Sequence, residues 1–265
     1  MALPPPSPDS TCVITGASSG IGADIARELA GRGLGVTLVA RREERLRELA
    51  AELGGRTEVH ACDITDEAAR KRLADDLAER GVAVDVLVNN AGFSTSGPFW
   101  KSDPEREVAL VRTNVEAVVA LCAAFLPGMV ERGRGAVLNV ASTASFQPLP
   151  MQASYAASKA FVLSFTDALH AELAGTGVTA TALCPGPVKT EFVEVANLQG
   201  AEDSMPGFLW STPEEVAKAA VKGMERGKRV VIPGALNRAG ALGGQHAPRS
   251  LILRLAKRIH PAAKS

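Results

Sequence analysis

The chain has 265 residues, of which 46% are hydrophobic, and it carries 29 basic and 29 acidic side chains. Domains typically hold about 100–200 residues, so this length allows one large domain or two small ones with a sizeable apolar core. The balanced charge excludes a net field that would draw the chain to nucleic acid or acidic substrates, and no apolar run approaches the roughly 18 residues of a membrane-spanning helix.

Residues 1–10 are rich in proline and have neither the basic start nor the apolar core of a signal peptide, so we expect a flexible leader. Beyond them, short apolar runs alternate with longer amphipathic stretches. The strand candidates are the apolar runs Thr11–Thr15, Gly35–Ala40, Glu58–Ala61, Val84–Asn89, Ala136–Ala141, Val178–Leu183 and Arg229–Ile232. The helix candidates between them are Ile21–Arg32, Glu43–Leu53, Asp66–Arg80, Pro104–Val130, Ala153–Ala174 and Pro213–Arg226.

Strands that are apolar along nearly their whole length are typical of a parallel sheet covered on both faces. Strict alternation of strands and helices predicts right-handed crossovers and a doubly wound sheet. We therefore predict an α/β fold, with a single domain over residues 11–233 built on a mostly parallel, seven-stranded sheet, and a C-terminal extension over residues 234–265. Ligands of such sheets bind beyond the carboxyl ends of the strands, so the segments there are the first candidates for a site.

A glycine-rich turn directly follows the first strand. Its glycines permit tight geometry, and the next helix offers free N–H groups to a pyrophosphate. The spacing is G-x-x-x-G-x-G rather than the commonest dinucleotide fingerprint, G-x-G-x-x-G. Such turns can also merely connect a strand to a helix, but the position in the first β-α unit favours phosphate binding. We assign to a coenzyme the turn residues Gly16, Ser18, Ser19, Gly20, Ile21 and Gly22.

Two arginines, Arg41 and Arg42, follow the second strand. Dinucleotide folds that use NAD place an acidic residue near this point for the ribose 2′-hydroxyl, whereas an arginine accommodates the 2′-phosphate of NADP. Ala40 stands at the acidic position here. An arginine pair at a helix start is often only solvated surface. Its place near a phosphate-binding turn nevertheless predicts NADP(H), with Arg41 at the 2′-phosphate and Arg42 as a second contact.

The only tyrosine, Tyr155, lies four residues before Lys159, so a helix would place both on one face. A free tyrosine titrates near pH ~10 and is a poor acid or base at neutral pH, but a nearby positive charge lowers its pKa. We therefore expect Lys159 to bring the pKa of Tyr155 toward the working range. Alone, such a pair is usually just two neighbours on a helix surface.

Together these segments resemble the short-chain dehydrogenase/reductase family. The resemblance rests on an ordered set of motifs, namely the glycine turn, Asn89-Asn90-Ala91-Gly92, Asn114, Ser142, Tyr155-x-x-x-Lys159 and Pro185-Gly186. These motifs run from residue 15 to about residue 190, and the pattern of elements extends the match to about residue 232. The resemblance implies a Rossmann-type fold, an oxidoreductase activity and a nicotinamide coenzyme.

The resemblance also implies further coenzyme contacts. Asp63 would hydrogen-bond the adenine amino group, beside Ile64, although Asp63 could instead cap the helix that follows. The adenosine ribose would be passed by Asn90, Ala91 and Gly92. The nicotinamide would be lined by Pro185, Gly186, Val188 and Thr190, with Thr190 at the carboxamide.

Four side chains would carry the chemistry in such a protein. Tyr155 would exchange a proton with the substrate oxygen, and Lys159 would lower the pKa of Tyr155 and hold the nicotinamide ribose. Ser142, thirteen residues before Tyr155, would donate a hydrogen bond where charge develops, although it lies in a cluster typical of a cap or turn. Asn114 would position a water that links Lys159 to solvent, although it could be an ordinary polar helix residue.

The long apolar segment 190–213 would cover the substrate in this family. We assign aromatic residues of this segment, and apolar residues that follow strand ends or precede Tyr155, to the substrate: Phe192, Phe208, Trp210, Phe93, Phe146 and Met151. No arginine is placed as an obvious clamp for a carboxylate or phosphate. We therefore expect a hydrophobic carbonyl or alcohol, such as a fatty-acyl, steroid, retinoid, aromatic or quinone compound.

The four cysteines are widely spaced and typical of buried, reduced thiols, so we expect a cytoplasmic protein without a metal site. The stretch Pro248–Pro261 has a basic and an apolar helical face, which predicts weak contact with a membrane surface or docking on protein. Helices Pro104–Val130 and Ala153–Ala174 correspond to those that pair subunits in the family, so we expect a homodimer or homotetramer. We expect a small-molecule substrate and no nucleic-acid partner.

Other functions stay open at this point. The same motifs allow an alcohol dehydrogenase that works in the oxidative direction. They also allow a non-enzymatic NADP-binding regulator, although such a protein would normally have lost the tyrosine, lysine or serine. The isomerase and dehydratase branch fits the modest length less well. Our prediction is an NADP(H)-dependent carbonyl reductase.

Overall fold

The computed structural model describes residues 3–192, 207–250 and 252–253. Within them, seven strands form one parallel sheet in the order β3-β2-β1-β4-β5-β6-β7. The strands are β1 (Ser10–Thr15), β2 (Val36–Ala40), β3 (Thr57–Ala61), β4 (Ala83–Asn89), β5 (Gly135–Val140), β6 (Val178–Leu183) and β7 (Val230–Val231). The predicted doubly wound α/β fold is confirmed, and the strand order reverses between β1 and β4.

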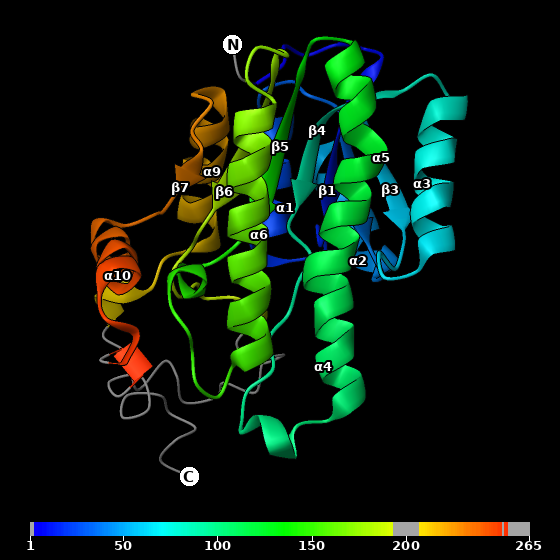
Figure 1. The fold of residues 1–265 in the computed structure, drawn as a ribbon. Coiled ribbons are helices and arrows are strands. Elements are labelled where there is room, and N and C mark those ends of the chain that lie inside the picture. The colour runs from blue at the N-terminus through cyan, green and yellow to red at the C-terminus, as the bar shows by residue number, and fades with distance from the viewer. Residues whose placement is uncertain (1–2, 193–206, 251, 254–265) are drawn as a thin grey trace.

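Helices cover both faces of the sheet, as Figure 1 shows. One face packs against α1 (Gly20–Ala30), α2 (Glu43–Leu53) and α9 (Pro213–Glu225). The other face packs against α3 (Glu67–Glu79), α5 (Ala117–Glu131) and α6 (Ala153–Glu172). Central strands β1, β4 and β5 are buried on both sides, which explains why their sequences are apolar almost without interruption.

The helix predicted over Pro104–Val130 is one rod made of three segments. Helix α4 (Pro104–Val111) begins at Asp103, whose side chain accepts from the N–H of Glu105, and a π-helical turn, η2 (Arg112–Glu116), joins it to α5. The rod has the length and mean hydropathy of a membrane span by composition alone. In the fold, apolar side chains of α5 pack against the sheet, where Leu121, Phe125 and Met129 are buried.

Two buried amides tie the strands together near their carboxyl ends. Asn89 of β4 donates through Nδ2 to Oδ1 of Asn139 on β5 at 2.8 Å, and Asn139 donates through Nδ2 to Oγ1 of Thr166 on α6 at 2.9 Å. A buried polar group costs free energy unless it is paired, so these bonds favour one register of strands and helix. They therefore position the two segments that leave β4 and β5.

The two ends of the chain differ from what we expect. Leu3 packs against the core, and Arg56 donates through Nη1 to the carbonyls of Pro8 at 2.9 Å and Ser10 at 3.2 Å, so the leader has specific contacts. After β7, the C-terminal extension forms helix α10 (Ala235–His246), which packs beside the short helix η3 (Thr143–Phe146). The basic stretch Pro248–Pro261 lies mostly outside the described residues.

Candidate active site

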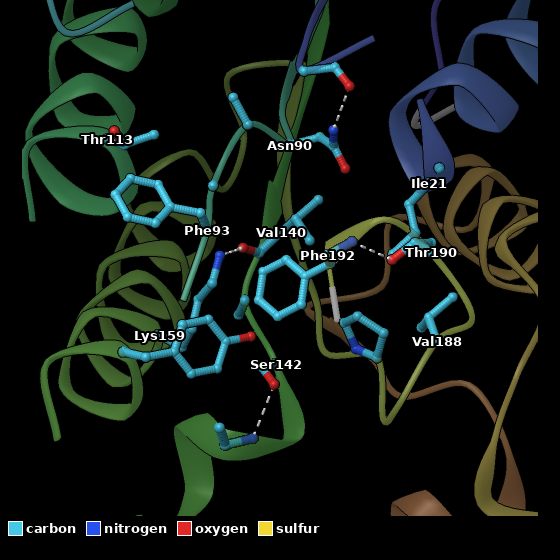
Figure 2. A pocket seen from close by; sticks show the side chains of 18 of the residues that line it. Ile21, Asn90, Phe93, Thr113, Val140, Ser142, Lys159, Val188, Thr190 and Phe192 are labelled. Atoms are coloured by element: carbon cyan, nitrogen blue, oxygen red, sulfur yellow. Dashed lines mark hydrogen bonds between the residues drawn. The ribbon is translucent and has the colours of Figure 1, made fainter. Parts of the chain in front are cut away.

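A cleft of about 1250 Å³ opens at the carboxyl ends of the strands. Every predicted coenzyme residue except Gly22 lines it, and so do Ser142, Tyr155 and Lys159. The location is the one expected for a doubly wound sheet, because β1 and β4 diverge there toward helices on opposite faces. Figure 2 shows side chains of this lining at close range.

The backbone of the glycine turn lines the cleft, with no Cβ atom at Gly16 or Gly20. Gly16 and Gly20 have left-handed backbones, with φ of +66° and +56°. A Cβ atom on Gly16 would lie 2.8 Å from Nδ2 of Asn90, while Gly22 packs behind the turn against the Gly16 carbonyl. Within the described chain, Ser19 makes no side-chain cap to α1, so the first-turn N–H groups stay available to an anion.

Asn90 clamps this turn to the end of β4. Its Nδ2 donates to the carbonyl of Thr15 at 2.9 Å and to that of Gly16 at 3.2 Å. In return, Oγ1 of Thr15 accepts from the backbone N–H groups of Asn90 at 3.0 Å and Ala91 at 3.1 Å. The Asn90 side chain thus shapes the floor of the cleft by holding the protein's own backbone.

The two arginines after β2 both line the cleft, but Arg42 is already engaged. It donates through Nη2 to Oγ of Ser19 at 2.8 Å and through Nη1 to Oε2 of Glu191 at 2.8 Å. Arg45 contacts the same carboxylate. Glu191 is a lining residue that the sequence analysis missed, because nothing in the chain pattern pairs positions so far apart.

Asp63 lines the cleft, and its predicted contact with adenine remains a prediction. Its Oδ1 accepts from the N–H and from Oγ1 of Thr65, at 2.9 and 2.8 Å. Burial raises the pKa of the Asp63 carboxyl, but these bonds and the charge of Arg41 outweigh it, so the net pKa is lowered. The alternative reading of Asp63 as the helix cap is wrong, because Asp66 caps α3 through the N–H of Ala68.

Tyr155 and Lys159 lie one turn apart on α6. The ammonium Nζ of Lys159 is 5.9 Å from the centroid of the Tyr155 ring and donates to the carbonyl of Val140 at 2.8 Å, a bond drawn in Figure 2. Lys159 is only 5% exposed. Burial therefore lowers the pKa of its ammonium to about 8.

The phenol of Tyr155 does not follow our expectation. Burial raises its pKa, the hydroxyl of Ser142 acts in the opposite direction, and burial wins. We expected Lys159 to lower this pKa. In the structure the Lys159 ammonium donates to the Val140 carbonyl, and the cost of desolvating a phenolate dominates the pKa of Tyr155.

Ser142 caps a helix, as one interpretation of its sequence predicts, and it also lines the cleft. It is the N-cap of η3, where its Oγ accepts from the N–H of Ala144 at 3.1 Å, and Oγ of Ser145 accepts from the N–H of Ser142. Its hydroxyl also acts on the Tyr155 phenol across the cleft. Capping holds Oγ in place beside the phenol, which is what a fixed hydrogen-bond donor at a reacting oxygen requires.

Asn114 sits behind the cleft lining, in the π-helical turn η2. Its Nδ2 donates to the carbonyl of Phe93 at 3.0 Å and to Oγ of Ser158 at 3.1 Å, while its Oδ1 accepts from the N–H of Phe93. A Cβ atom on Gly92 would lie 2.9 Å from that Oδ1. The side chain therefore fixes the segment between β4 and α4, and its role toward a water remains a prediction.

The six predicted substrate residues divide into three groups. Phe93, Phe192 and Trp210 line the cleft, and the Phe192 ring lies 5.7 Å from that of Tyr155. Phe146 lines a separate cavity of about 220 Å³ between η3, α6 and the C-terminal extension, so its assignment is wrong. Met151 is also wrong, because it is absent from the described lining. Its backbone is left-handed, with φ of +70°. Phe208 lies in η4 (Gly207–Leu209), but its side chain is outside the described residues.

Other lining residues were missed. The cleft includes Arg106 of α4, whose Cζ lies 5.9 Å from the centroid of the Phe93 ring. The sequence had offered no obvious arginine clamp, but the structure places the side chain of Arg106 in the lining of the cleft. The C-terminal extension adds Gly243, Gly244, Ala247 and Ile252 to the wall. Among them only Ile252 falls within the stretch Pro248–Pro261, whose amphipathic pattern was visible in the sequence.

Residues 10–200 match the model of the family described as short chain dehydrogenase. The chain belongs to the short-chain dehydrogenase family. It is 41% identical to "Sulfoacetaldehyde reductase 2" of Chromohalobacter salexigens, over 78% of this chain and 84% of that one. It is 35% identical to "Very-long-chain 3-oxoacyl-CoA reductase" of Anas platyrhynchos, over 79% of this chain and 67% of that one.

Among solved structures of the family, a short-chain dehydrogenase from Sphingobium yanoikuyae in complex with NADPH superposes with a TM-score of 0.80. It is 34% identical, and the match covers 92% of this chain and 95% of that one. These relatives confirm that the chain is an oxidoreductase of the short-chain dehydrogenase family. Their names differ in substrate.

The buried Lys159 predicts a specific dependence of stability on pH. The ordinary pKa of 10.5 falls to about 8 in the folded protein. Between these values the folded chain binds fewer protons than the unfolded chain, so the free energy of unfolding should rise with pH by at most about 3 kcal/mol. Below pH ~8 both states are charged, and the cost of burial is present in full.

The measurement is urea unfolding of the wild type and of Lys159→Met from pH 7 to 10. The difference between the two proteins isolates Lys159. The raised pKa values of Tyr155 and the buried cysteines lower the free energy of unfolding as the pH rises, and they do so in both proteins. Parallel curves over this range would show that the Lys159 ammonium is not desolvated.

Proposed function

We propose that the chain is an NADP(H)-dependent oxidoreductase that interconverts a carbonyl and an alcohol, with Tyr155 as general acid and base. The observation that carries the proposal is the placement of Tyr155, Ser142 and Lys159 in the same cleft as the glycine turn and two arginines. The similar protein from Sphingobium yanoikuyae that holds NADPH supports the coenzyme. A non-catalytic regulator is not favoured, because the tyrosine, lysine and serine are all present in the cleft.

The residues present fit such a coenzyme. Gly16 and Gly20 carry no Cβ atom, and the uncapped first turn of α1 suits a pyrophosphate. Arg41 and Arg42 would meet the 2′-phosphate, and Asp63 the adenine. The nicotinamide would supply or accept the hydride when bound. Thr190 approaches Gly20, since its Cγ2 lies 3.0 Å from the position of a Cβ atom there.

The protein's own part is to hold and move a proton. The raised pKa keeps the Tyr155 phenol protonated at neutral pH, which is the form that donates to a carbonyl oxygen during reduction. Ser142 would donate a second hydrogen bond to that oxygen. Once the phenol has given its proton, the Lys159 ammonium, 5.9 Å from the ring centroid, would attract the phenolate, although burial keeps the pKa of Tyr155 raised overall.

For the substrate we propose a hydrophobic carbonyl or alcohol compound. Phe93, Phe192, Trp210 and Leu149 supply an apolar wall beside the phenol. Arg106 adds a cation to the cleft, which would also suit an acidic group at the far end of such a compound. To judge from their names, one relative acts on a sulfonate and another on a fatty-acyl thioester. Because these substrates differ, the substrate class proposed for this chain rests on the residues that line its own cleft.

We expect Tyr155→Phe to lower turnover by about 10²- to 10⁴-fold while NADPH still binds, because only the transferable proton is removed. NADPH consumption should be followed against carbonyls graded by size and polarity, including acidic ones, with wild type and variant side by side. Rates should be highest for bulky apolar ketones. Full activity of the variant would refute the role of Tyr155, and faster reduction of small charged keto acids would refute the apolar pocket.

The 2′-phosphate contact predicts a change in coenzyme preference in Arg41→Asp. An aspartate repels the phosphate and can accept a hydrogen bond from a ribose 2′-hydroxyl, so the variant should favour NADH. The ratio of the dissociation constants for NADPH and NADH, measured by fluorescence titration, checks this. An unchanged ratio would remove Arg41 from the site.

We also propose a cytoplasmic homodimer or homotetramer. Exposed apolar side chains gather on the outer face of α4, α5 and α6, including Val108, Val111, Val119 and Phe161. All four cysteines are free and buried, which suits a reducing compartment. Light scattering should give a mass of two or four subunits, and a single-subunit mass would contradict the proposal. The membrane contact concerns residues outside those described.

A further inference from the structure

We propose that Glu191 tunes coenzyme specificity by competing with the ribose 2′-phosphate for the guanidinium group of Arg42. The inference rests on the proposed function, because it concerns the same coenzyme. It predicts that Glu191 weakens binding of the phosphorylated coenzyme and leaves binding of the unphosphorylated one nearly unchanged.

The contact geometry shows an anion already bound to this arginine. Oε2 of Glu191 accepts from Nη1 of Arg42 at 2.8 Å, and its other oxygen contacts Nη1 of Arg45. The remaining nitrogens of Arg42 donate to Oγ of Ser18 and Ser19, at 3.0 and 2.8 Å for Nη2. A guanidinium fork binds carboxylates and phosphates in the same way, so the carboxylate takes the place that a phosphate needs.

Glu191 reaches this position from a distant part of the chain. It lies 149 residues after Arg42, directly behind Thr190, which approaches Gly20 of the glycine turn. Arg41, Arg42 and Glu191 all line the cleft. The carboxylate therefore stands at the phosphate end of the cleft, although Glu191 begins the segment predicted to cover the substrate.

The strength of the pair sets the size of the effect. The side chains of Arg42 and Glu191 are 45% and 39% exposed, so water screens their attraction. Exposed ion pairs of this kind contribute about 0.2–1 kcal/mol. The hydrogen bonds from Arg42 and Arg45 hold the pKa of the Glu191 carboxyl at about 2, so it stays ionised throughout the neutral range. A phosphate can displace this carboxylate, but only at the cost of that pair.

Coenzymes with and without the 2′-phosphate should meet Glu191 differently. To bind Arg42, the phosphate must displace the carboxylate of Glu191, and the two negative charges then repel each other. A coenzyme with a 2′-hydroxyl can leave the ion pair in place. Removing the charge of Glu191 should therefore tighten binding of NADP⁺ by roughly fivefold at most and change that of NAD⁺ much less.

Isothermal titration calorimetry of NADP⁺ and NAD⁺ with the full chain tests this, using wild type, Glu191→Gln and a matched control. The control is Glu43→Gln, which removes the same charge from α2, where Glu43 pairs with Arg47 and not with Arg42. Glu191→Gln should lower the dissociation constant of NADP⁺ relative to that of NAD⁺, and the control should leave this ratio unchanged.

Titration with adenosine 2′,5′-bisphosphate and adenosine 5′-monophosphate distinguishes an effect of Glu191 on binding of the 2′-phosphate from an effect transmitted through Thr190. Tightening for the bisphosphate alone would support competition at Arg42. An unchanged NADP⁺ to NAD⁺ ratio in Glu191→Gln, or an equal shift in Glu43→Gln, would overturn the inference while the proposed function stands. A wild type that binds neither coenzyme would overturn both.

Discussion

The clamp between Asn90 and the glycine turn is the contact on which the site depends. It joins the ends of β1 and β4, the neighbouring strands between which the sheet order reverses. The clamp requires Gly16, because a Cβ atom there would collide with Asn90 and with the backbone of Ala91. With the turn drawn against β4, the N-terminus of α1 faces the cleft. The chain after Asn90 then reaches Gly92, which lies beside Asn114 and Lys159.

Close packing of small residues also determines the electrostatics of the catalytic centre. Gly92 leaves room for both Asn114 and Lys159, since a Cβ atom there would lie 2.9 Å from Oδ1 of the first and 3.4 Å from Nζ of the second. Lys159 can therefore be buried below Tyr155 and bonded to the Val140 carbonyl. Burial lowers the pKa of the ammonium and raises that of the phenol. Both shifts follow from removing water from one small space.

The chemical centre and the substrate wall are built from different parts of the chain. The motifs shared with the short-chain dehydrogenase family lie in the turns after β1, β4, β5 and β6, in η2 and on α6. The wall draws on Arg106, Phe192, Trp210 and the C-terminal extension, which carry no such motif. Two relatives in the family are named for a small sulfonated aldehyde and for a very long acyl thioester. A shared fold thus transfers the reaction more readily than the substrate.

The sequence by itself determined the order of strands and helices and the place of the cleft, and it indicated that Ser142, Tyr155 and Lys159 would lie there together. Apolar runs and turn residues act locally, and parallel strands bring their carboxyl ends to one edge. Only the tertiary structure decided that Phe146 faces another cavity, that Arg106 faces the cleft, and that Glu191 holds Arg42. It also decided the direction of the Tyr155 pKa shift. These properties depend on distance and burial, and a linear pattern does not contain the contacts between residues far apart in the chain.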